Sequence, residues 1–377
     1  MKVFFLLLLI LQTFSQEEKP VLVILQFMNQ EKSFSKFINQ VKSLGKRVEV
    51  VDMDTNVQFE SYDEFNYDSV YILAPKYTFK SITAHQLKRY VGAGGNVFFA
   101  ISQVYTSSVK SFLSTFKVTP EDATQGDFTT IKNALFKETT VAFKGVSLEI
   151  PKTPAFVSLL SENTLNSKYS NKQHSLVFTF QSLANGRLVI SGSVELFSDV
   201  NFNNNSDFVI PLIQWAMQEH GKLILKNVQI TKIAGAPDVE NEGMFFINDT
   251  VSVSFDISQK VGGVLTEYNA DDVMVEYRFV TPVISNYAQN LKNGSYVFTT
   301  VLPDRFGVYT ILINYTKPLL SRLEFNKVTP IRPFRHDHVE RFQTQCMPFY
   351  LAYFSMSVST VIFVFFYLNY KENPKRD

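Results

Sequence analysis

The residues with the clearest potential for chemistry are Asp52 and Asp54, which flank Met53 at the end of an apolar run. An Asp-x-Asp at the end of a strand can hold a divalent cation against a sugar nucleotide, as in metal-dependent glycosyltransferases. Acidic residues are also common loop formers at the carboxyl ends of parallel strands. The motif is only three residues long, so a structural role is favoured, and a glycosyltransferase that uses Asp52 and Asp54 is kept as an alternative.

Glycines at 92, 94 and 95 suggest a dinucleotide-binding loop at first sight. Such a loop must follow a strand and open a helix, so that the amides of the helix face the phosphates. Here the glycines follow a predicted helix and precede a predicted strand. We interpret them as helix-stop residues.

Nucleophilic and metal-binding groups are sparse. Ser102 and Gln103 follow a predicted strand, but no glycines frame them as a nucleophile elbow. His336 and His338 form a His-x-His pair for which the sequence shows no third ligand, and His85, His174 and His220 are scattered. We therefore expect no catalytic, metal or cofactor-binding residue in this chain.

In the first half of the chain, predicted strands alternate with predicted helices, and most of the residues discussed above lie on or next to these elements. Continuous apolar runs indicate strands buried on both faces, and the alternation implies a parallel sheet covered on both sides. We predict an α/β domain over residues 16–221 that resembles flavodoxin-like or amidotransferase-like layers. Its expected strands are 21–27, 47–53, 69–74, 96–101 and 187–194, and its expected helices are 34–44, 83–91 and 206–220, the last with Ser206 as N-cap and Gly221 beyond its end.

The pattern changes after residue 221 to strands without helices. An Asn293-Gly294 turn signal is typical of an antiparallel hairpin. We predict a β-sandwich over residues 222–330. Its expected strands are 222–233, 244–257, 273–280, 295–302 and 307–315.

Two apolar segments at the ends of the chain set its topology. The uncharged run Met347–Tyr370 would span roughly 36 Å as a helix, more than the roughly 30 Å hydrocarbon core of a bilayer, which predicts one transmembrane helix. Residues 1–15 have a basic start, an apolar core and small polar residues, which predicts a cleaved signal peptide. The body would then be lumenal or exterior, with a juxtamembrane connector at 331–346 and a cytosolic tail at 371–377.

Composition agrees with a large folded ectodomain. The chain has 377 residues and a net charge of +1, which suggests no basic field for nucleic acid. Its one cysteine, Cys346, lies at the membrane boundary and leaves no possible internal disulfide. The fold must therefore be held by burial alone, and Cys346 is interpreted as a packed or palmitoylated residue.

Two further sets of residues are candidates for modification and for packing. The Asn-x-Ser/Thr motifs are candidate N-glycosylation sites, and they occur at Asn204, Asn248, Asn293 and Asn314. Within the transmembrane run, Ala352, Ser355 and Ser359 fall within about 60° of one another on a helix. A face of small residues lets another helix approach closely, so we expect this face to dock a partner helix.

Several specific strings occur in a fixed order along the chain. They are YDSVYILAP at 67–75, SGS at 191–193 with FSD at 197–199 and Asn201, DDVMVEYRFVTP at 271–282, LPDRFGVY at 302–309, HVERF at 338–342, PFY at 348–350 and FSM at 354–356. With these strings the chain resembles the 48 kDa non-catalytic subunit family of eukaryotic oligosaccharyltransferase. The resemblance covers nearly the whole chain, and its most specific parts lie around 304–309 and 340–356.

The resemblance implies a lumenal subunit of an endoplasmic reticulum membrane complex that transfers a glycan from a dolichol carrier to asparagines of nascent chains. The catalytic site of that family's complex belongs to a different, multi-pass subunit, which would be a partner of this chain. A single-pass receptor or cargo-binding ectodomain, and the glycosyltransferase using Asp52 and Asp54, are the alternatives from other functional classes.

Overall fold

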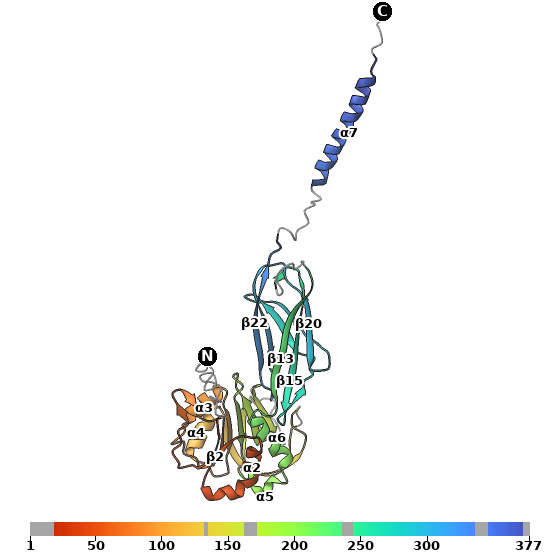
Figure 1. The fold of residues 1–377 in the computed structure, drawn as a ribbon. Helices are drawn as coiled ribbons and strands as arrows, with labels where there is room; N and C mark the ends of the chain where they lie inside the picture. Colours follow the sequence, from red (N-terminus) through yellow and green to blue (C-terminus); the bar gives the residue numbers. More distant parts are fainter. Residues whose placement is uncertain (1–18, 132–134, 162–171, 236–243, 336–345, 372–377) are drawn as a thin grey trace, which may run out of the picture. The chain divides into compact units, whose positions relative to one another are not determined.

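The computed structural model describes residues 19–131, 135–161, 172–235, 244–335 and 346–371 (Figure 1). The predicted signal peptide, the His336 and His338 pair and most of the predicted tail lie outside these residues. The described chain forms two compact units. The first holds Met1–Gln229, Val253–Phe298 and Thr310–Lys327, and the second holds Ile230–Ser252, Thr299–Tyr309 and Val328–Asp377.

A seven-stranded sheet forms the centre of the α/β region, in the order β2-β1-β5-β6-β12-β11-β9. The first five strands are parallel, and β11 and β9 complete the sheet in antiparallel fashion. In chain order the parallel strands run 2-1-3-4-5, the flavodoxin-like order, so the predicted α/β fold is confirmed. The bounds are β1 (Val21–Leu25), β2 (Val48–Asp52), β5 (Ser69–Leu73), β6 (Asn96–Ala100), β9 (Phe156–Leu160), β11 (Val177–Gln181) and β12 (Arg187–Ser191).

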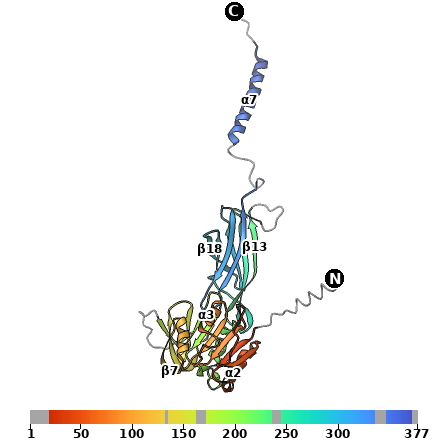
Figure 2. The ribbon, with the colours of Figure 1, turned by 90° about the vertical axis from the view of Figure 1, so that its left-hand side faces the viewer.

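Helices cover both faces of this sheet because alternate residues of each strand point to opposite sides. Val21 and Val23 of β1 pack with α2 (Ser35–Ser43) and α6 (Ser206–Ala216) in one apolar cluster. Leu22 and Ile24 pack with α3 (Ala84–Gly92) and α4 (Ser107–Thr115) in another. Figures 1 and 2 show the helices against the sheet. Short helices η1 (Met28–Phe34), η2 (Glu195–Phe197) and α5 (Asp199–Phe202) follow β1 and β12.

The structure confirms the predicted end of one helix and contradicts both predicted ends of another. Helix α3 ends at Gly92, and Gly94 has φ +103°, so the glycines do stop the helix. Helix α6 was predicted to run to His220 with Ser206 as N-cap, and both points are wrong. Asn205 precedes the first turn, and the left-handed backbone of Gln218 (φ 59°) follows the early end at Ala216.

Residues 104–186, which show no clear period, supply α4, two strands of the central sheet and a second sheet in the order β10-β8-β7. These strands are β7 (Thr119–Thr129), β8 (Thr140–Pro151) and β10 (Lys172–Ser175). A small hairpin of β3 (Glu60–Ser61) and β4 (Glu64–Phe65) lies earlier in the chain. The long hairpin of β7 and β8 contributes buried Val146, Leu148 and Ile150 to the α3/α4 side of the core.

Two five-stranded sheets make up the β-rich region, which agrees with the predicted strands without helices. One sheet contains β13 (Lys222–Ala234), β15 (Thr250–Val261), β20 (Ser295–Val301) and β19 (Gln289–Asn290), with β16 (Val264–Glu267) paired to β15. The other contains β14 (Phe245–Phe246), β22 (Leu323–Arg332), β21 (Gly307–Tyr315), β17 (Met274–Arg278) and β18 (Pro282–Tyr287). The single strand predicted over 244–257 is wrong, because a turn with Asn248 at φ 60° separates β14 from β15 in different sheets.

The last described helix is α7 (Met347–Asn369), with Cys346 as its N-cap residue. It is long and apolar enough to cross a membrane, and no part of its apolar surface is buried within this chain. The prediction of one long apolar helix at this end of the chain is therefore confirmed.

Candidate functional site

Asp52 and Asp54 lie at the carboxyl end of β2, beside a cavity of about 270 Å³. Asp54 is exposed, whereas Asp52 is partly buried and its backbone carbonyl accepts a hydrogen bond from the Thr55 N–H at 3.0 Å. The cavity is lined by Met53, Asp54, Thr55, Asn56, Lys80 and Ser81. In the part of the chain that the structure describes, no three His, Cys, Asp or Glu side chains are grouped so as to hold a metal ion. The arrangement thus offers turn formation and no completed cation site.

For the function that the resemblance implies, we expect a double Asp52→Asn, Asp54→Asn variant to leave glycan transfer within about twofold of wild type. The substitutions keep the backbone hydrogen bond that forms the turn but remove two negative charges, which a metal site would need. Transfer to an acceptor peptide by complexes purified through a tag on this chain provides the measurement. A large loss of turnover in a complex of normal composition would contradict the expectation.

The amino end of helix α2, which follows β1, is the place where an open α/β sheet commonly offers amides to an anion. The carboxylate of Asp199 fills it. The Asp199 side chain accepts hydrogen bonds from the Ser35 N–H (3.1 Å), the Lys36 N–H (2.9 Å) and the Ser35 hydroxyl (2.6 Å). Partial burial opposes ionisation of Asp199, but these hydrogen bonds outweigh it and lower the pKa of its carboxyl below the usual value. The chain thus supplies its own anion to this helix.

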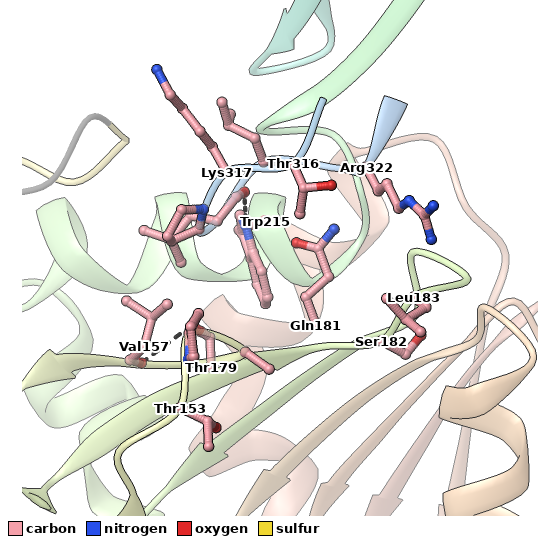
Figure 3. Close-up of a pocket in the computed structure, with 15 residues that line it drawn as sticks. Thr153, Val157, Thr179, Gln181, Ser182, Leu183, Trp215, Thr316, Lys317 and Arg322 are labelled. Atoms are coloured by element: carbon pink, nitrogen blue, oxygen red, sulfur yellow. Dashed lines mark hydrogen bonds between the residues drawn. The ribbon is translucent and has the colours of Figure 1, made fainter. Parts of the chain in front are cut away.

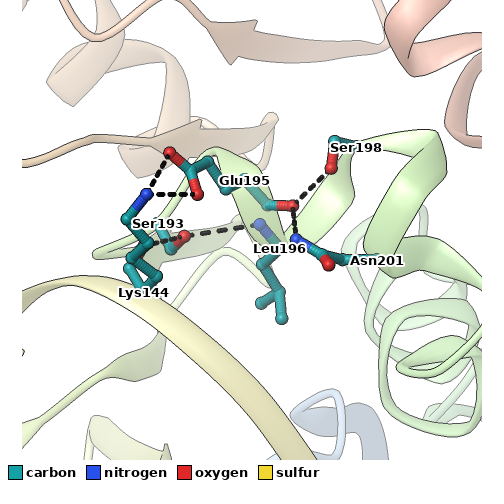
Figure 4. Close-up of polar contacts among 6 residues, drawn as sticks. All are labelled: Lys144, Ser193, Glu195, Leu196, Ser198 and Asn201. Atoms are coloured by element: carbon teal, nitrogen blue, oxygen red, sulfur yellow. Dashed lines mark hydrogen bonds and ion pairs between the residues drawn. The ribbon is translucent and has the colours of Figure 1, made fainter. Parts of the chain in front are cut away.

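A polar network that includes Ser193, Glu195 and Asn201 organises the segment that carries Asp199 (Figure 4). The Ser193 hydroxyl donates to the Lys144 carbonyl at 2.6 Å and accepts from the Leu196 N–H at 3.3 Å. The Glu195 carbonyl accepts from the Ser198 hydroxyl (2.8 Å) and the Asn201 amide (3.0 Å), and its carboxylate pairs with Lys144. Because Ser193 is buried and bonded on both sides, it has a structural role in this turn.

Gly192 lies at a close crossing between the end of β12 and β8. The Gly192 carbonyl accepts from the Val146 N–H at 2.9 Å, and its own N–H donates to the Leu176 carbonyl at 2.9 Å. A Cβ built on Gly192 would lie 1.9 Å from the Val146 carbonyl oxygen. The glycine of the Ser-Gly-Ser string is therefore required by backbone packing.

Arg187, the first residue of β12, is the largest charged side chain in the described core and has 0% exposure. Its guanidinium donates to the carbonyls of Trp215 (2.6 Å), His220 (2.6 Å) and Gly221 (3.0 Å), and lies 4.6 Å from the centre of the Trp215 ring. Burial lowers the pKa of Arg187 to about 9. The carbonyls at the end of α6 stabilise this cation in place of a carboxylate.

A mostly apolar pocket of about 360 Å³ lies beside this cluster (Figure 3). The Trp215 ring forms part of its wall, and the indole N–H donates to the Leu319 carbonyl at 2.7 Å. Asn185 holds the segment 316–322 by donating to the Arg322 carbonyl (3.0 Å) and accepting from the Arg322 N–H (2.6 Å). The lining also includes Thr153, Pro154, Ala155, Val157, Thr179, Gln181, Ser182, Leu183, Thr316, Lys317, Pro318 and Leu320. Among the described residues, the pocket lining contains no carboxylate, histidine or cysteine.

His220 makes the stability of this region sensitive to mild acid. Burial and the neighbouring Arg187 charge lower the pKa of His220 below its usual 6.5. The unfolded chain therefore binds a proton at a higher pH than the folded chain, and stability is lost as pH falls below 6.5. We expect His220→Gln to flatten the decrease in the urea midpoint between pH 7 and pH 5, measured by fluorescence of the chain's single tryptophan. The exposed His85→Gln variant should keep the wild-type slope, and an unchanged slope in His220→Gln would contradict the assignment.

The asparagines of the four sequons are all exposed, at Asn204, Asn248, Asn293 and Asn314. Asn293 lies between Lys292 and Gly294, both with positive φ, in the turn before β20. Asn314 lies within β21, and its side-chain oxygen accepts a hydrogen bond from Arg322 at 3.3 Å.

We expect higher glycan occupancy at Asn293 than at Asn314. A turn presents its side chain to water, whereas a strand with a neighbouring guanidinium restricts access to the asparagine. Site-resolved mass spectrometry of the protein from its native membrane gives the ranking. Glycan on Asn314 with Asn293 bare would refute it.

Ala352, Ser355 and Ser359 lie on α7, as expected, and their side chains are exposed in this chain. The Ser355 hydroxyl donates to the Ala352 carbonyl (2.9 Å), and the Ser359 hydroxyl donates to the Ser355 carbonyl (2.8 Å). Both hydroxyl protons are therefore used within the helix. A partner helix would gain close packing from this face and could donate hydrogen bonds to its serine oxygens.

Sequence reasoning located Asp52, Asp54, the sequons and the serine face, but it missed the contacts that organise the site. Arg187 and Trp215 were not singled out, and Asp199 entered only as part of the FSD string, because each acts through partners distant in sequence. One signal was available: a charged residue that opens a strand of otherwise apolar residues, as Arg187 does in RLVIS, must find buried partners.

Comparisons with known proteins give the following matches. The family model described as "OST48, N-terminal domain" matches residues 12–131, and the one described as "OST48 middle domain" matches residues 233–371. Relatives named dolichyl-diphosphooligosaccharide–protein glycosyltransferase 48 kDa subunit are similar over nearly the full length. The one from Arabidopsis thaliana is 26% identical over 97% of this chain and 97% of its own length. The one from Drosophila melanogaster is 24% identical, over 96% and 94%.

Among solved structures, the N-terminal domain of mmIFT52 matches with a TM-score of 0.42 and 14% identity, over 52% of this chain and 97% of that chain. A putative ThuA-like protein from Bacteroides uniformis matches with a TM-score of 0.36 and 10% identity, over 55% and 94%.

Proposed function

Because this chain belongs to the OST48 family, we propose that it stands on the lumenal side of the endoplasmic reticulum membrane and supports transfer of a dolichol-linked oligosaccharide to nascent-chain asparagines. It is a non-catalytic subunit of oligosaccharyltransferase and takes part in N-glycosylation. In our proposal a multi-pass subunit performs the transfer, and α7 anchors this chain beside it. The short segment after α7 would be cytosolic.

The similarity over almost the entire chain carries this proposal. It includes both the α/β region and the β-rich region, and one of the two family models extends to residue 371, through α7. The order of elements is compatible with the same arrangement, because the folded regions precede α7, the helix that is long and apolar enough to cross a membrane.

The geometry of the described residues fits a scaffolding and binding role. The amino end of α2 is occupied by Asp199, and the lining of the largely apolar pocket beside Trp215 contains no carboxylate, histidine or cysteine among the described residues. The alternative of a glycosyltransferase using Asp52 and Asp54 finds no third ligand in the described portion of the chain.

Purification of the detergent-solubilised complex through a tag on this chain tests the proposal. We expect the multi-pass catalytic subunit to co-purify, and the preparation to transfer a dolichol-linked glycan to an acceptor peptide. Depletion of this chain should lower sequon occupancy on secreted glycoproteins. Recovery of a soluble ligand without other membrane subunits would favour a receptor and overturn the proposal.

The α7 face gives a second, independent test of assembly. Ser355→Leu with Ser359→Leu adds apolarity, so membrane insertion should be retained, but the larger side chains prevent close approach of a second helix. We expect recovery of the multi-pass subunit to fall about tenfold or more. Val361→Leu with Val364→Leu is the control, since it changes exposed aliphatic residues of α7 without filling the serine face. Unchanged recovery with the serine variant would show that the lumenal parts alone hold the complex.

A further inference from the structure

A groove opens along one side of the β-rich region, between the edges of its two sheets. It measures about 800 Å³ and is lined only by Lys222–Val228 of β13 and by Arg322–Lys327, of which all but Arg322 belong to β22. All of these residues belong to the first compact unit. We call this feature the edge groove; Figure 1 labels both strands.

Both strands of the edge groove have an edge with no described strand beside it. β13 is the terminal strand of its sheet and has β15 as its neighbour. β22 pairs with β21 on one side, and on the other side β14 reaches only Ile331 and Arg332. The N–H and C=O groups along the free edge of β22 can therefore accept an added strand.

One end of the edge groove is closed, which fixes where an added strand can begin. The Leu223 N–H donates to the Ser321 hydroxyl at 2.7 Å, and the Ser321 N–H donates to the Gly221 carbonyl at 2.9 Å. Beyond these bonds the strands belong to separate sheets. β13 has a left-handed residue at Asn227 (φ 53°), which interrupts its regular extended backbone. Of the two edges, β22 offers the regular one.

The charge of the edge groove selects its occupant. Lys222, Lys226 and Lys327 are exposed cations, while the single carboxylate, Glu324, pairs with Arg322 at 3.0 Å. Three positive charges remain, so an acidic segment is attracted. A second copy of this chain, presenting the same lysines, would be repelled along the same edge.

We propose that the edge groove binds an extended, acidic segment of another subunit, which adds to β22 as a further strand. The inference rests on the proposed function, because it requires the chain to be part of a complex. Backbone hydrogen bonds to residues 323–327 provide affinity, and the lysines select a partner segment that carries negative charge. In the alternative, the same lysines keep the free edge of β22 from pairing with any strand. A crosslinking probe at position 326 would then give no crosslink to another subunit.

A photo-crosslinking amino acid in place of Asn326 tests the proposal in the full chain within the intact complex. Asn326 is exposed in the edge groove, and its replacement leaves the three lysines in place. Ser285, exposed on β18 at the opposite edge of the same sheet, is the matched control position. We expect the probe at 326 to crosslink to an acidic stretch of another subunit, and the probe at 285 not to reach that stretch.

Charge reversal supplies the second measurement. Lys226→Glu with Lys327→Glu should lower the crosslinked yield from position 326 about tenfold or more, while arginine at both positions should preserve it. Lys32→Glu with Lys292→Glu changes two exposed lysines outside the groove and should have no effect. No crosslink from 326 in a complex that contains the catalytic subunit, or a crosslink to a second copy of this chain, would overturn the inference. Failure to recover any complex would overturn the proposed function itself.

Discussion

Replacing Arg187 by Met is expected to lower the free energy of unfolding by about 3 kcal/mol or more. The change leaves the carbonyls of Trp215, His220 and Gly221 without their donor in a fully buried position, and each unpaired group costs roughly 1 to 3 kcal/mol. Relief of the buried charge offsets part of this loss, because burial already lowers the pKa of Arg187 to about 9. Trp215 lies against the guanidinium, so its fluorescence during urea unfolding of the full chain reports the effect directly.

Two matched variants define what Arg187 contributes. Lysine at this position keeps a cation but cannot reach three carbonyls in one plane, so its loss should fall between those of wild type and the Met variant. Arg47→Met, at a side chain that is 78% exposed, should change stability by less than about 0.5 kcal/mol. If the Arg187→Met variant were as stable as wild type, the three carbonyls would have to find other donors.

Replacing Gly192 by Ala is expected to cost about 3 kcal/mol and to reduce the yield of folded protein. The added methyl would meet the backbone oxygen of Val146 at 1.9 Å, and a backbone atom in a paired strand cannot move aside as a side chain can. Gly126→Ala in β7 is the control, because its nearest neighbours are ring atoms of Phe128 at 3.5 Å, an ordinary contact.

Resistance to limited proteolysis and the urea midpoint of the two alanine variants provide the comparison. Gly126→Ala should match wild type within about 1 kcal/mol. Equal stability of the two variants would mean that β8 and the end of β12 can separate without loss, which would contradict the close crossing at Gly192.

The parts of the fold that sequence predicted well are those in which one segment carries its own signal. The runs VLVIL and NVFFA are buried along their whole length, and Thr83 forms a capping box with Gln86, so each element could be recognised alone. The end of α6 and the identity of β22 could not be recognised in this way. Helix α6 ends near residues whose carbonyls accept hydrogen bonds from the Arg187 guanidinium. Strand β22 has both polar and apolar residues and contains a proline, which usually argues against a strand.

The residues of the candidate site also divide into those that one short segment reveals and those that only the folded chain brings together. Asp52 and Asp54 were visible because the signal is a short string, and the structure leaves them without a third ligand among the described residues. The pocket beside Trp215 was invisible because its walls come from β9, β11, α6 and the segment after β21. Only the folded arrangement brings those four segments together.

The hydrogen bonds between Asp199 and the start of α2 have a consequence for binding equilibria. A carboxylate carried by the same chain competes with any free anion at an effective concentration that is on the order of millimolar even for a flexible tether, and a folded turn positions it better. A free phosphate or nucleotide must therefore displace this carboxylate to reach the helix end. The start of α2 thus receives its anion from the chain itself and needs no bound metabolite.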